Sequence, residues 1–235
     1  MNASTRTGLA ILVKTPGHSS LKTRLAATIG RDAAHAFHTL AANAVAAVAR
    51  AAQDKLPWLV PIWAVAESAA LDDLRWASLP RIAQGEGDLG VRMGRVCAAL
   101  RATHGRALLL GADAPQLEID DLVAAVDALS AHEHVLGPSA DGGFWLFGTR
   151  SAVPVAAWAT PWSQPDTAAR FGGALGDERI ARLRTLRDVD TAEDLAPLLA
   201  ALAALRDPLP EQAALAAWLH GLGVSAARMA RATGK

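Results

Sequence analysis

Basic side chains gather around one short stretch near the start of the chain. Lys14, Lys22 and Arg24 lie close together in sequence, and the first carboxylate of the chain is Asp32. A lysine ammonium binds a phosphate as a point charge, whereas an arginine can grip two oxygens at once. These residue types predict a site for phosphate groups.

The residues around this stretch indicate how it is held. Residues 9–13 are a continuous apolar run, typical of a strand buried on both faces. A Pro-Gly pair at 16–17 stops regular structure, and a helical pattern resumes at 22–25 and can close at Gly30. A strand, a loop and a helix N-terminus together present N–H groups to an anion. The alternatives are a solvated basic turn and a P-loop, which needs Gly where this chain has Leu21.

Two carboxylates follow apolar runs that we expect to be strands. Asp113 comes after residues 107–110, and Asp141 follows residues 135–136 and precedes two glycines. In an open parallel sheet, ligands bind beyond the carboxyl ends of the strands. A carboxylate repels a nearby phosphate unless a divalent cation lies between them, so Asp113 is a candidate metal ligand. Asp141 is a candidate general base or acceptor-orienting group. The structural alternatives are a turn or helix cap at Asp113 and a hairpin turn at Asp141.

Further metal-ligand patterns have competing explanations. Asp190 could complete a metal site, or it could cap a helix beside the Thr-x-x-Asp pattern that begins at Thr191. His35 and His38 lie one helical turn apart, but two histidines without a third ligand are more often surface residues. The His-Glu-His sequence at 132–134 is typical of a polar loop that leads into a strand.

A glycine-rich turn covers residues 84–90, Gln-Gly-Glu-Gly-Asp-Leu-Gly. It follows a short strand expected at 81–83 and precedes a helical pattern from residue 91 towards 102, which carries Arg92. Glycines let a flat ligand approach the backbone closely. The turn is therefore a second candidate binding element.

Composition excludes several classes of protein. The 235 residues carry a net charge of zero, so a general polyanion such as DNA is not an expected partner. The single cysteine, Cys97, excludes an internal disulfide. No apolar run approaches the ~20 residues of a membrane span, and no signal-peptide core precedes the first strand. We therefore expect a soluble cytoplasmic protein.

Taken in order, the motifs resemble those of one known family. They are Lys14-x-Pro16, Lys22-Thr23-Arg24-Leu25, Gln84-Gly-x-Gly-x-Leu-Gly-x-Arg92-Met93, Gly111-Ala-Asp113-x-Pro115, Gly137-Pro-x-x-Asp141-Gly-Gly, Trp162-Ser163 and Asp188-Val-Asp190-Thr-x-x-Asp194. The set is similar to that of bacterial glycosyltransferase-A-like (GT-A-like) proteins, the selenodomain-associated transferases or arsenosugar-biosynthesis glycosyltransferases. The resemblance covers roughly residues 9–195.

The resemblance implies a fold and a division of the chain. The fold is the Rossmann-like, three-layer α/β/α fold of nucleotide-diphospho-sugar transferases, with a mostly parallel sheet. Residues 1–195 would form this domain, and residues 196–235 a helical extension packed on it. The extension carries two apolar stripes, which we expect to serve packing or a homodimer: Leu198, Leu199, Leu202 and Leu205, then Leu215, Trp218, Leu219 and Leu222.

The resemblance also implies an activity: transfer of a sugar from a nucleotide-diphosphate sugar to a small-molecule acceptor, with Mg²⁺ or Mn²⁺. Asp113 and Asp190 would hold the metal, and Asp141 and Asp113 would be catalytic. The residues assigned to the nucleotide are Val13, Lys14, Pro16, Gly17, Lys22, Arg24, Gln84, Gly85, Gly87, Gly90 and Arg92. Those assigned to the sugar and acceptor are Gly142, Gly143, Phe144, Trp162 and Ser163.

Two other functions stay open at this point. The N-terminal pattern is also similar to that of the guanylyltransferases of deazaflavin-cofactor biosynthesis. These enzymes join a nucleoside monophosphate to a phosphorylated small acid and release pyrophosphate. A nucleotide-binding regulatory module without catalysis is the third possibility.

Overall fold

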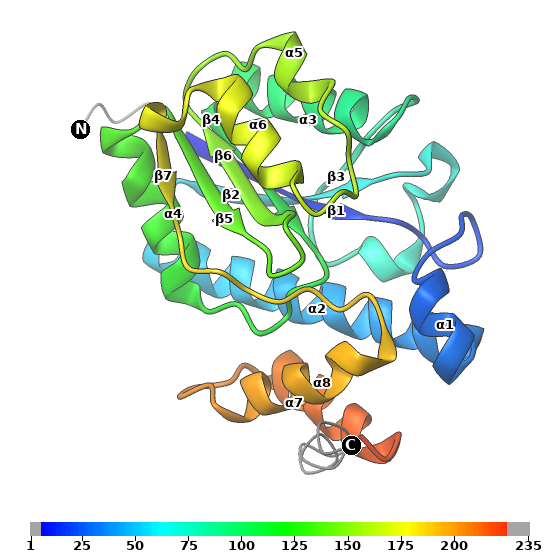
Figure 1. Cartoon of the computed structure of the whole chain (residues 1–235). Helices are drawn as coiled ribbons and strands as arrows, with labels where there is room; N and C mark the ends of the chain where they lie inside the picture. The colour runs from blue at the N-terminus through cyan, green and yellow to red at the C-terminus, as the bar shows by residue number, and fades with distance from the viewer. Residues whose placement is uncertain (1–5, 225–235) are drawn as a thin grey trace, which may run out of the picture.

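A seven-stranded sheet forms the centre of the protein, and the computed structural model describes residues 6–224 around it. The strand order is β3-β2-β1-β4-β6-β5-β7 (Figure 1). Neighbouring strands are parallel except around β6, which is antiparallel to β4 and β5. The strands are β1 (Arg6–Val13), β2 (Leu59–Val65), β3 (Arg81–Ala83), β4 (Gly105–Gly111), β5 (His134–Pro138), β6 (Phe144–Thr149) and β7 (Ile180–Arg182).

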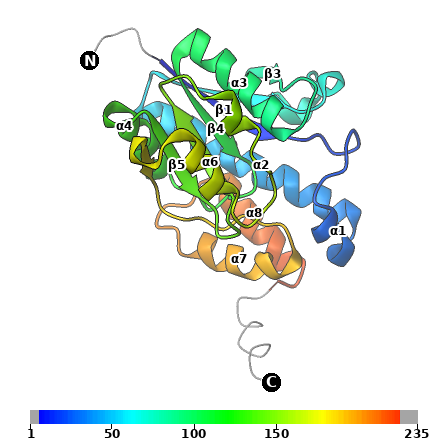
Figure 2. The ribbon, with the colours of Figure 1, turned by 45° about the horizontal axis from the view of Figure 1, so that its top comes forward.

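Helices cover both faces of this sheet (Figures 1 and 2). Side chains of α3, α5 and α6 pack on one face, and those of α2 and α4 pack on the other. The helices are α1 (Thr23–Ile29), α2 (Arg31–Lys55), α3 (Leu89–His104), α4 (Ile119–Ala131), α5 (Val155–Trp158), α6 (Thr167–Leu175), α7 (Leu195–Ala203) and α8 (Pro210–Gly221). The predicted three-layer α/β/α fold with a mostly parallel sheet is confirmed. Within residues 6–224, no helix has both the length and the hydropathy to cross a membrane.

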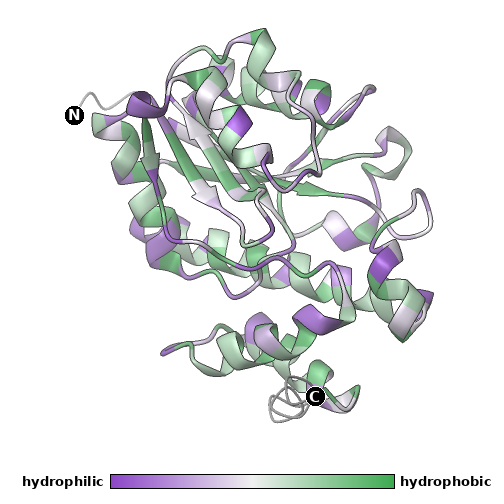
Figure 3. Cartoon of the chain, in the orientation of Figure 1, coloured by the Kyte–Doolittle hydropathy of each residue, from purple (hydrophilic) through white to green (hydrophobic). Residues whose placement is uncertain are grey.

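Strand β1 shows why its sequence is a continuous apolar run. Leu9, Ile11 and Val13 pack into the layer of α2, whereas Ala10 packs into the layer of α3. Because helices cover both faces, residues 7–11 are buried on either side of the sheet, and only Leu12 near the end of the strand is partly exposed. Figure 3 shows the resulting band of hydrophobic strands through the middle of the molecule.

Helices α7 and α8 pack outside α2 (Figure 2). Leu198 and Leu202 of α7 and Leu215 and Leu219 of α8 are buried in one cluster with Phe37 of α2. The two apolar stripes are therefore covered largely by the chain itself. The predicted extension runs to residue 235, and its residues 225–235 lie outside the described part of the chain, as do residues 1–5.

The sequence pattern of residues 71–77 predicts a short helix, but the structure has two 3₁₀ turns here, Ser68–Ala70 and Leu74–Trp76. The side chain of Asp73 accepts the Arg75 N–H at 2.9 Å, which starts a new turn instead of continuing the first. The buried Trp76 then fixes the second turn, because its indole N–H donates to Thr15 Oγ1 at 3.0 Å.

By residue type, Asp32 is expected to cap the long helix α2, and Asp120 or Asp121 is expected to cap α4; both predictions are wrong. Helix α2 begins at Arg31 after Gly30, whose positive φ of 87° ends α1 and leaves Asp32 inside the first turn of α2. Helix α4 begins after Glu118, and neither Asp120 nor Asp121 is its N-cap. Asp121 instead accepts the Glu118 N–H at 2.7 Å from within the first turn.

The sheet brings three segments together at one edge, which is formed by the carboxyl ends of its parallel strands β1 and β4. Strands β1 and β4 are parallel and both end at this edge, and the antiparallel β6 begins there. Lys14 follows β1, Asp113 lies just beyond β4, and Phe144 opens β6. Chemistry-bearing residues from distant parts of the sequence therefore meet at one place.

Candidate active site

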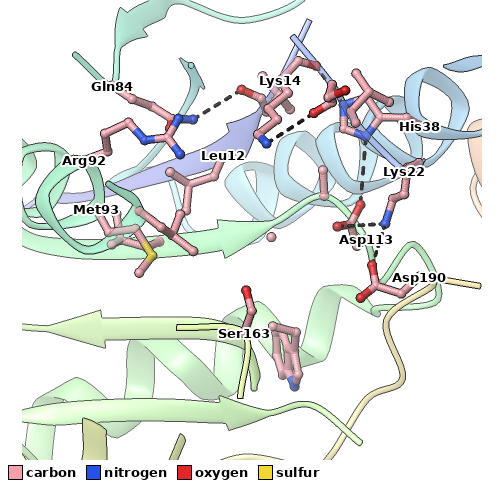
Figure 4. Close-up of a pocket in the computed structure, with 18 of the residues that line it drawn as sticks. Leu12, Lys14, Lys22, His38, Gln84, Arg92, Met93, Asp113, Ser163 and Asp190 are labelled. Carbon is pink, nitrogen blue, oxygen red and sulfur yellow. Dashed lines mark hydrogen bonds and ion pairs between the residues drawn. The ribbon is translucent and has the colours of Figure 1, made fainter. Parts of the chain in front are cut away.

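A cavity of about 590 Å³ opens at this edge of the sheet (Figure 4). Leu12 of β1, Met93 of α3 and Leu109 of β4 give it an apolar side. The predicted site residues that line it are Val13, Lys14, Lys22, Arg24, Gln84, Arg92, Asp113, Phe144, Ser163 and Asp190. The predicted residues outside its lining are Pro16, Gly17, Gly85, Gly87, Gly90, Asp141, Gly142, Gly143 and Trp162.

Lys22 lies at the centre of the polar side (Figure 4). Its ammonium is 2.9 Å from Asp113 Oδ2 and 3.4 Å from Asp190 Oδ1, and it donates to the Val189 carbonyl. Arg24 Nη2 is 2.8 Å from Asp190 Oδ2. The side chain of Lys22 is only 5% exposed, so these contacts hold its charge inside the protein. Two predicted cations and the two predicted metal ligands thus form one network.

His38 of α2 lies next to the same network. Its Nε2 is 2.9 Å from the Lys14 carbonyl oxygen, and its Nδ1 is 3.9 Å from Asp113 Oδ1. Burial lowers the pKa of His38, although the charge of Asp113 opposes this shift. The sequence favoured a surface position for both His35 and His38, but His38 is buried, and the partners that distinguish it from His35 are distant in the chain.

The loop after β1 is held by Glu67. Its carboxylate accepts the Thr15 N–H at 2.8 Å and the Ser19 hydroxyl. Although burial would raise the pKa of Glu67, these hydrogen bonds lower it. On the outside of the loop, the Pro16 carbonyl accepts from Arg75 Nη1 at 2.9 Å. Gly17 has a φ of 92° and lines a neighbouring hollow.

The glycine-rich turn is shaped by contacts within the protein. Gln84 donates to the carbonyls of Val13 at 3.2 Å and Ala64 at 2.8 Å, so its amide nitrogen is fully used. Arg95 Nη1 donates to the Gln84 carbonyl at 2.7 Å and to the Glu86 carbonyl at 2.9 Å. The positive φ angles of Gly85 and Gly87 permit this tight turn, and the turn presents Gln84 and Arg92 to the cavity.

Gly90 serves close packing. A Cβ at this position would overlap the Trp158 carbonyl oxygen, so only glycine lets α3 approach the α5 segment so closely. Trp162 lies against the same place, and its indole N–H donates to the Trp158 carbonyl at 3.3 Å. Phe144 meets Trp162 edge-on with ring centroids 6.0 Å apart. Trp162 therefore packs against Phe144, which lines the cavity.

Asp141 and its glycines form the turn between β5 and β6. Asp141 Oδ1 accepts the Gly143 N–H at 2.9 Å, and a Cβ at Gly142 would overlap the Pro165 carbonyl. Asp141 lines a separate hollow of about 170 Å³ that shares Arg24 and Asp190 with the main cavity. The hairpin turn that was the structural alternative is therefore present.

Asp188 is a further acidic residue in this smaller hollow. Burial raises the pKa of Asp188 to about 6, and the neighbouring carboxylate of Asp141 adds to the shift. Its Oδ1 is buried and has no hydrogen-bond partner among the described residues. The Asp-Val-Asp motif at 188–190 was the sequence signal that could have identified Asp188. From this motif, however, only Asp190 was predicted to be a site residue.

The described residues contain no cluster of three or more His, Cys, Asp or Glu side chains able to hold a metal ion by themselves. Asp113 nevertheless has one free oxygen, because Lys22 contacts Oδ2 while Oδ1 is buried without a hydrogen-bond partner within residues 6–224. Mg²⁺ often binds through one or two carboxylates together with water and substrate phosphates. The residues therefore fit a cation that is completed by its substrate.

The sheet order, with a cavity at the carboxyl ends of its parallel strands, matches a fold known from solved structures of nucleotide-diphospho-sugar transferases. A similar structure is that of a protein from Desulfovibrio desulfuricans G20 assigned as a nucleotide-diphospho-sugar transferase. The two share 21% identity and a TM-score of 0.77 over 93% of this chain and 96% of the other. The chain belongs to the DUF2064 family, "Uncharacterized protein conserved in bacteria", whose model matches residues 44–164.

A synthase and a synthetase have the same fold at lower structural similarity. One is 4-diphosphocytidyl-2C-methyl-D-erythritol synthase from Anaerococcus prevotii DSM 20548, with 11% identity and a TM-score of 0.52 over 87% of this chain and 97% of the other. The other is CMP:2-keto-3-deoxy-manno-octonic acid synthetase complexed with CTP, with 12% identity and a TM-score of 0.51 over 85% and 99%. No curated protein matches the sequence.

Proposed function

We propose that this protein is a glycosyltransferase that uses a nucleotide-diphosphate sugar and a small-molecule acceptor. The observation that carries the proposal is the pairing of Lys22 and Arg24 with Asp113 and Asp190 beside a cavity of about 590 Å³. Cations suited to a diphosphate and carboxylates suited to a metal ion thus lie at one end of a nucleotide-sized space. The superfamily fold supports the same proposal.

The residues divide the work as follows. Lys14, Lys22 and Arg24 bind the diphosphate, and Gln84 and Arg92 lie on the side that receives the base and ribose. The residues that would hold Mg²⁺ or Mn²⁺ are Asp113 and Asp190. A divalent cation bound there would supply positive charge against the departing diphosphate.

The acceptor binds towards the β5–β6 turn in this proposal. Phe144 and Ser163 form part of the cavity wall, and an aromatic ring can pack against the apolar face of a sugar. Asp141 and Asp188 lie in the adjoining hollow, and either carboxylate can orient an acceptor hydroxyl or take its proton.

Nucleotidyl transfer is the second candidate, because two proteins of the same fold are named as a CMP:2-keto-3-deoxy-manno-octonic acid synthetase, in complex with CTP, and a 4-diphosphocytidyl-2C-methyl-D-erythritol synthase. The two reactions break different bonds. A glycosyltransferase releases a nucleoside diphosphate from a nucleotide sugar, and a nucleotidyltransferase releases pyrophosphate from a nucleoside triphosphate.

The experiment incubates the protein with Mn²⁺ and a panel of nucleotide sugars or nucleoside triphosphates, and assays diphosphate and pyrophosphate separately. We expect slow release of a nucleoside diphosphate from one nucleotide sugar through transfer to water, even without the true acceptor. Pyrophosphate from a triphosphate, with no diphosphate from any sugar donor, would replace the first candidate by the second.

A further inference from the structure

His38 and Asp113 face one another with two buried atoms that lack hydrogen-bond partners within the described residues. These atoms are Nδ1 of His38 and Oδ1 of Asp113, which lie 3.9 Å apart at the cavity wall (Figure 4). The His38 side chain is only 7% exposed, and its ring lies edge-on to Trp76. The pair is therefore held in place, and a buried polar atom without a partner needs an explanation.

The other ring nitrogen of His38 decides which atom carries the proton. Nε2 is 2.9 Å from the Lys14 carbonyl, which can only accept, so Nε2 carries hydrogen. In the neutral ring, Nδ1 then directs a lone pair at a carboxylate oxygen. Metal-ligating histidines commonly donate their second N–H to a backbone carbonyl in this way.

We propose that His38 Nδ1 and Asp113 Oδ1 are a pair of ligands for one divalent first-row transition-metal ion. The inference rests on the proposed function for the presence of a cation, and it adds a nitrogen ligand that selects the metal. Metal–ligand bonds of roughly 2.0–2.2 Å allow one ion to contact both atoms at their present separation. Imidazole nitrogen favours transition metals, whereas Mg²⁺ prefers oxygen ligands only.

The charges around the pair are consistent with such an ion. Asp113 is shared, with Oδ2 bound to Lys22 and Oδ1 left for the cation. The formal charges of Lys22, Arg24, Asp113 and Asp190 sum to zero. A bound divalent ion therefore leaves an excess positive charge that a diphosphate can neutralise, so the ion and a nucleoside diphosphate should strengthen each other's binding.

The test compares His38→Gln with His35→Gln, one turn earlier on α2. Glutamine can still donate to the Lys14 carbonyl but places no ring nitrogen opposite Asp113. Mn²⁺ binding is followed by electron paramagnetic resonance, with and without a nucleoside diphosphate, and Mg²⁺ binding by competition. We expect the wild type to prefer Mn²⁺, the His38 variant to lose at least tenfold in Mn²⁺ affinity with little change for Mg²⁺, and the His35 variant to match the wild type.

A second measurement avoids any dependence on the variant's folding. In wild-type protein labelled with ¹⁵N-histidine, sub-stoichiometric Mn²⁺ should broaden the His38 ring resonances before those of His35. Unchanged Mn²⁺ affinity in a folded His38→Gln, or no selective broadening of His38, would overturn the inference. If those results came with normal nucleotide turnover, the proposed function would survive. If Mn²⁺ bound through His38 but no nucleotide donor were turned over, the inference would stand and the proposed function would fail.

Discussion

Lys22 has a left-handed backbone conformation, and its charged side chain is buried. Its φ of 49° places it in the left-handed region, which costs a non-glycine residue roughly 1–2 kcal/mol. The ammonium offsets this cost through contacts with Asp113, Asp190 and the Val189 carbonyl. A diphosphate that binds here must compete with these oxygens for the same ammonium. A metal ion at Asp113 would weaken that competition, so cation and nucleotide should depend on one another.

Replacement of Lys22 by alanine should weaken nucleoside diphosphate binding about tenfold to a hundredfold. The variant loses a charge-assisted contact worth roughly 1.5–3 kcal/mol and leaves two carboxylates facing the ligand. Isothermal titration calorimetry with Mn²⁺ measures the change. Lys55→Ala is the matched control, because Lys55 pairs with Asp120 outside the main cavity. Equal affinity of wild type and Lys22→Ala would remove Lys22 from the binding site.

At the scale of single residues, candidate site residues could be predicted from the sequence, but the residues with which they pair could not. The cations at 22 and 24 could be picked out because they cluster near the start of the chain, Asp113 by its position after an apolar run, and Asp190 by its place beside the Thr-x-x-Asp pattern. Their pairing could not, because Lys22 and Asp190 are 168 residues apart and meet only through the sheet topology. His38 and Glu67 were not predicted to be site residues for the same physical reason: each is distinguished by a distant atom of the loop after β1.

At the scale of elements, the loop between β1 and α1 depends on one carboxylate. Glu67 accepts hydrogen bonds from the Thr15 N–H and the Ser19 hydroxyl, and so ties the loop to the segment that follows β2. The loop is therefore held by a carboxylate of the protein itself, independently of any bound ligand.

Glu67→Gln should loosen this loop, because its amide group would present N–H hydrogens to one of the two donors. We expect hydrogen exchange of the Thr15 amide to quicken by about tenfold and nucleotide affinity to fall, since hydrogen bonds to charged groups contribute roughly 1.5–3 kcal/mol. Exchange measured by mass spectrometry on the 14–20 peptide tests this. Glu86→Gln, at an exposed residue in the glycine-rich turn, should leave the peptide unchanged. Wild-type protection in Glu67→Gln would contradict the proposed support.

The contact between α3 and the α5 segment allows a second prediction at this scale. Gly90→Ala forces a methyl group against the Trp158 carbonyl and should destabilise the fold by about 1–3 kcal/mol. Urea denaturation measures the loss. Gly173→Ala in α6 is the control, because a Cβ at this position would have open space around it among residues 6–224, and helix propensity should stabilise the variant by up to ~1 kcal/mol. Equal effects of the two substitutions would show that α3 has room to move.

At the scale of the whole molecule, stability should fall on mild acidification. Burial lowers the pKa of His134, whose ring stacks on Phe147 and contacts Thr149. As the pH falls through about 6.5, the unfolded chain takes up a proton that the folded chain resists, so the free energy of unfolding decreases. Above that pH the histidine is neutral in both states and this loss is absent.

His134→Asn should therefore flatten the decline between pH 7.5 and 5.5, by up to ~1.4 kcal/mol per pH unit where the folded group stays neutral. The asparagine can keep the contact with Thr149 but does not titrate. Urea unfolding at each pH gives the slopes, with His132→Asn, at an exposed ring, as the control. Identical slopes for wild type and His134→Asn would exclude His134 as the source.

The architecture was more predictable than the site because its signals are local. Continuous apolar runs gave β1 and β4, and the Asp-Gly pair marked the turn that makes β6 antiparallel. The two 3₁₀ turns before β3 and the start of α4 were mispredicted, because Asp73 and Asp121 bind neighbouring backbone in ways that propensity does not specify. Which glycines face a ligand and which face Trp158 or Pro165 depends on packing between elements.

The bridge between Lys22 and the segment at Val189 and Asp190 has a consequence for protein synthesis. A ribosome adds roughly 5–20 residues per second, so about 10 to 30 s separate the translation of the two partners. During that interval β1 and β4 can already pair, while the ammonium has only Asp113 to contact. The nascent chain therefore has an incomplete site. It can bind a nucleotide at the complete site only near the end of translation.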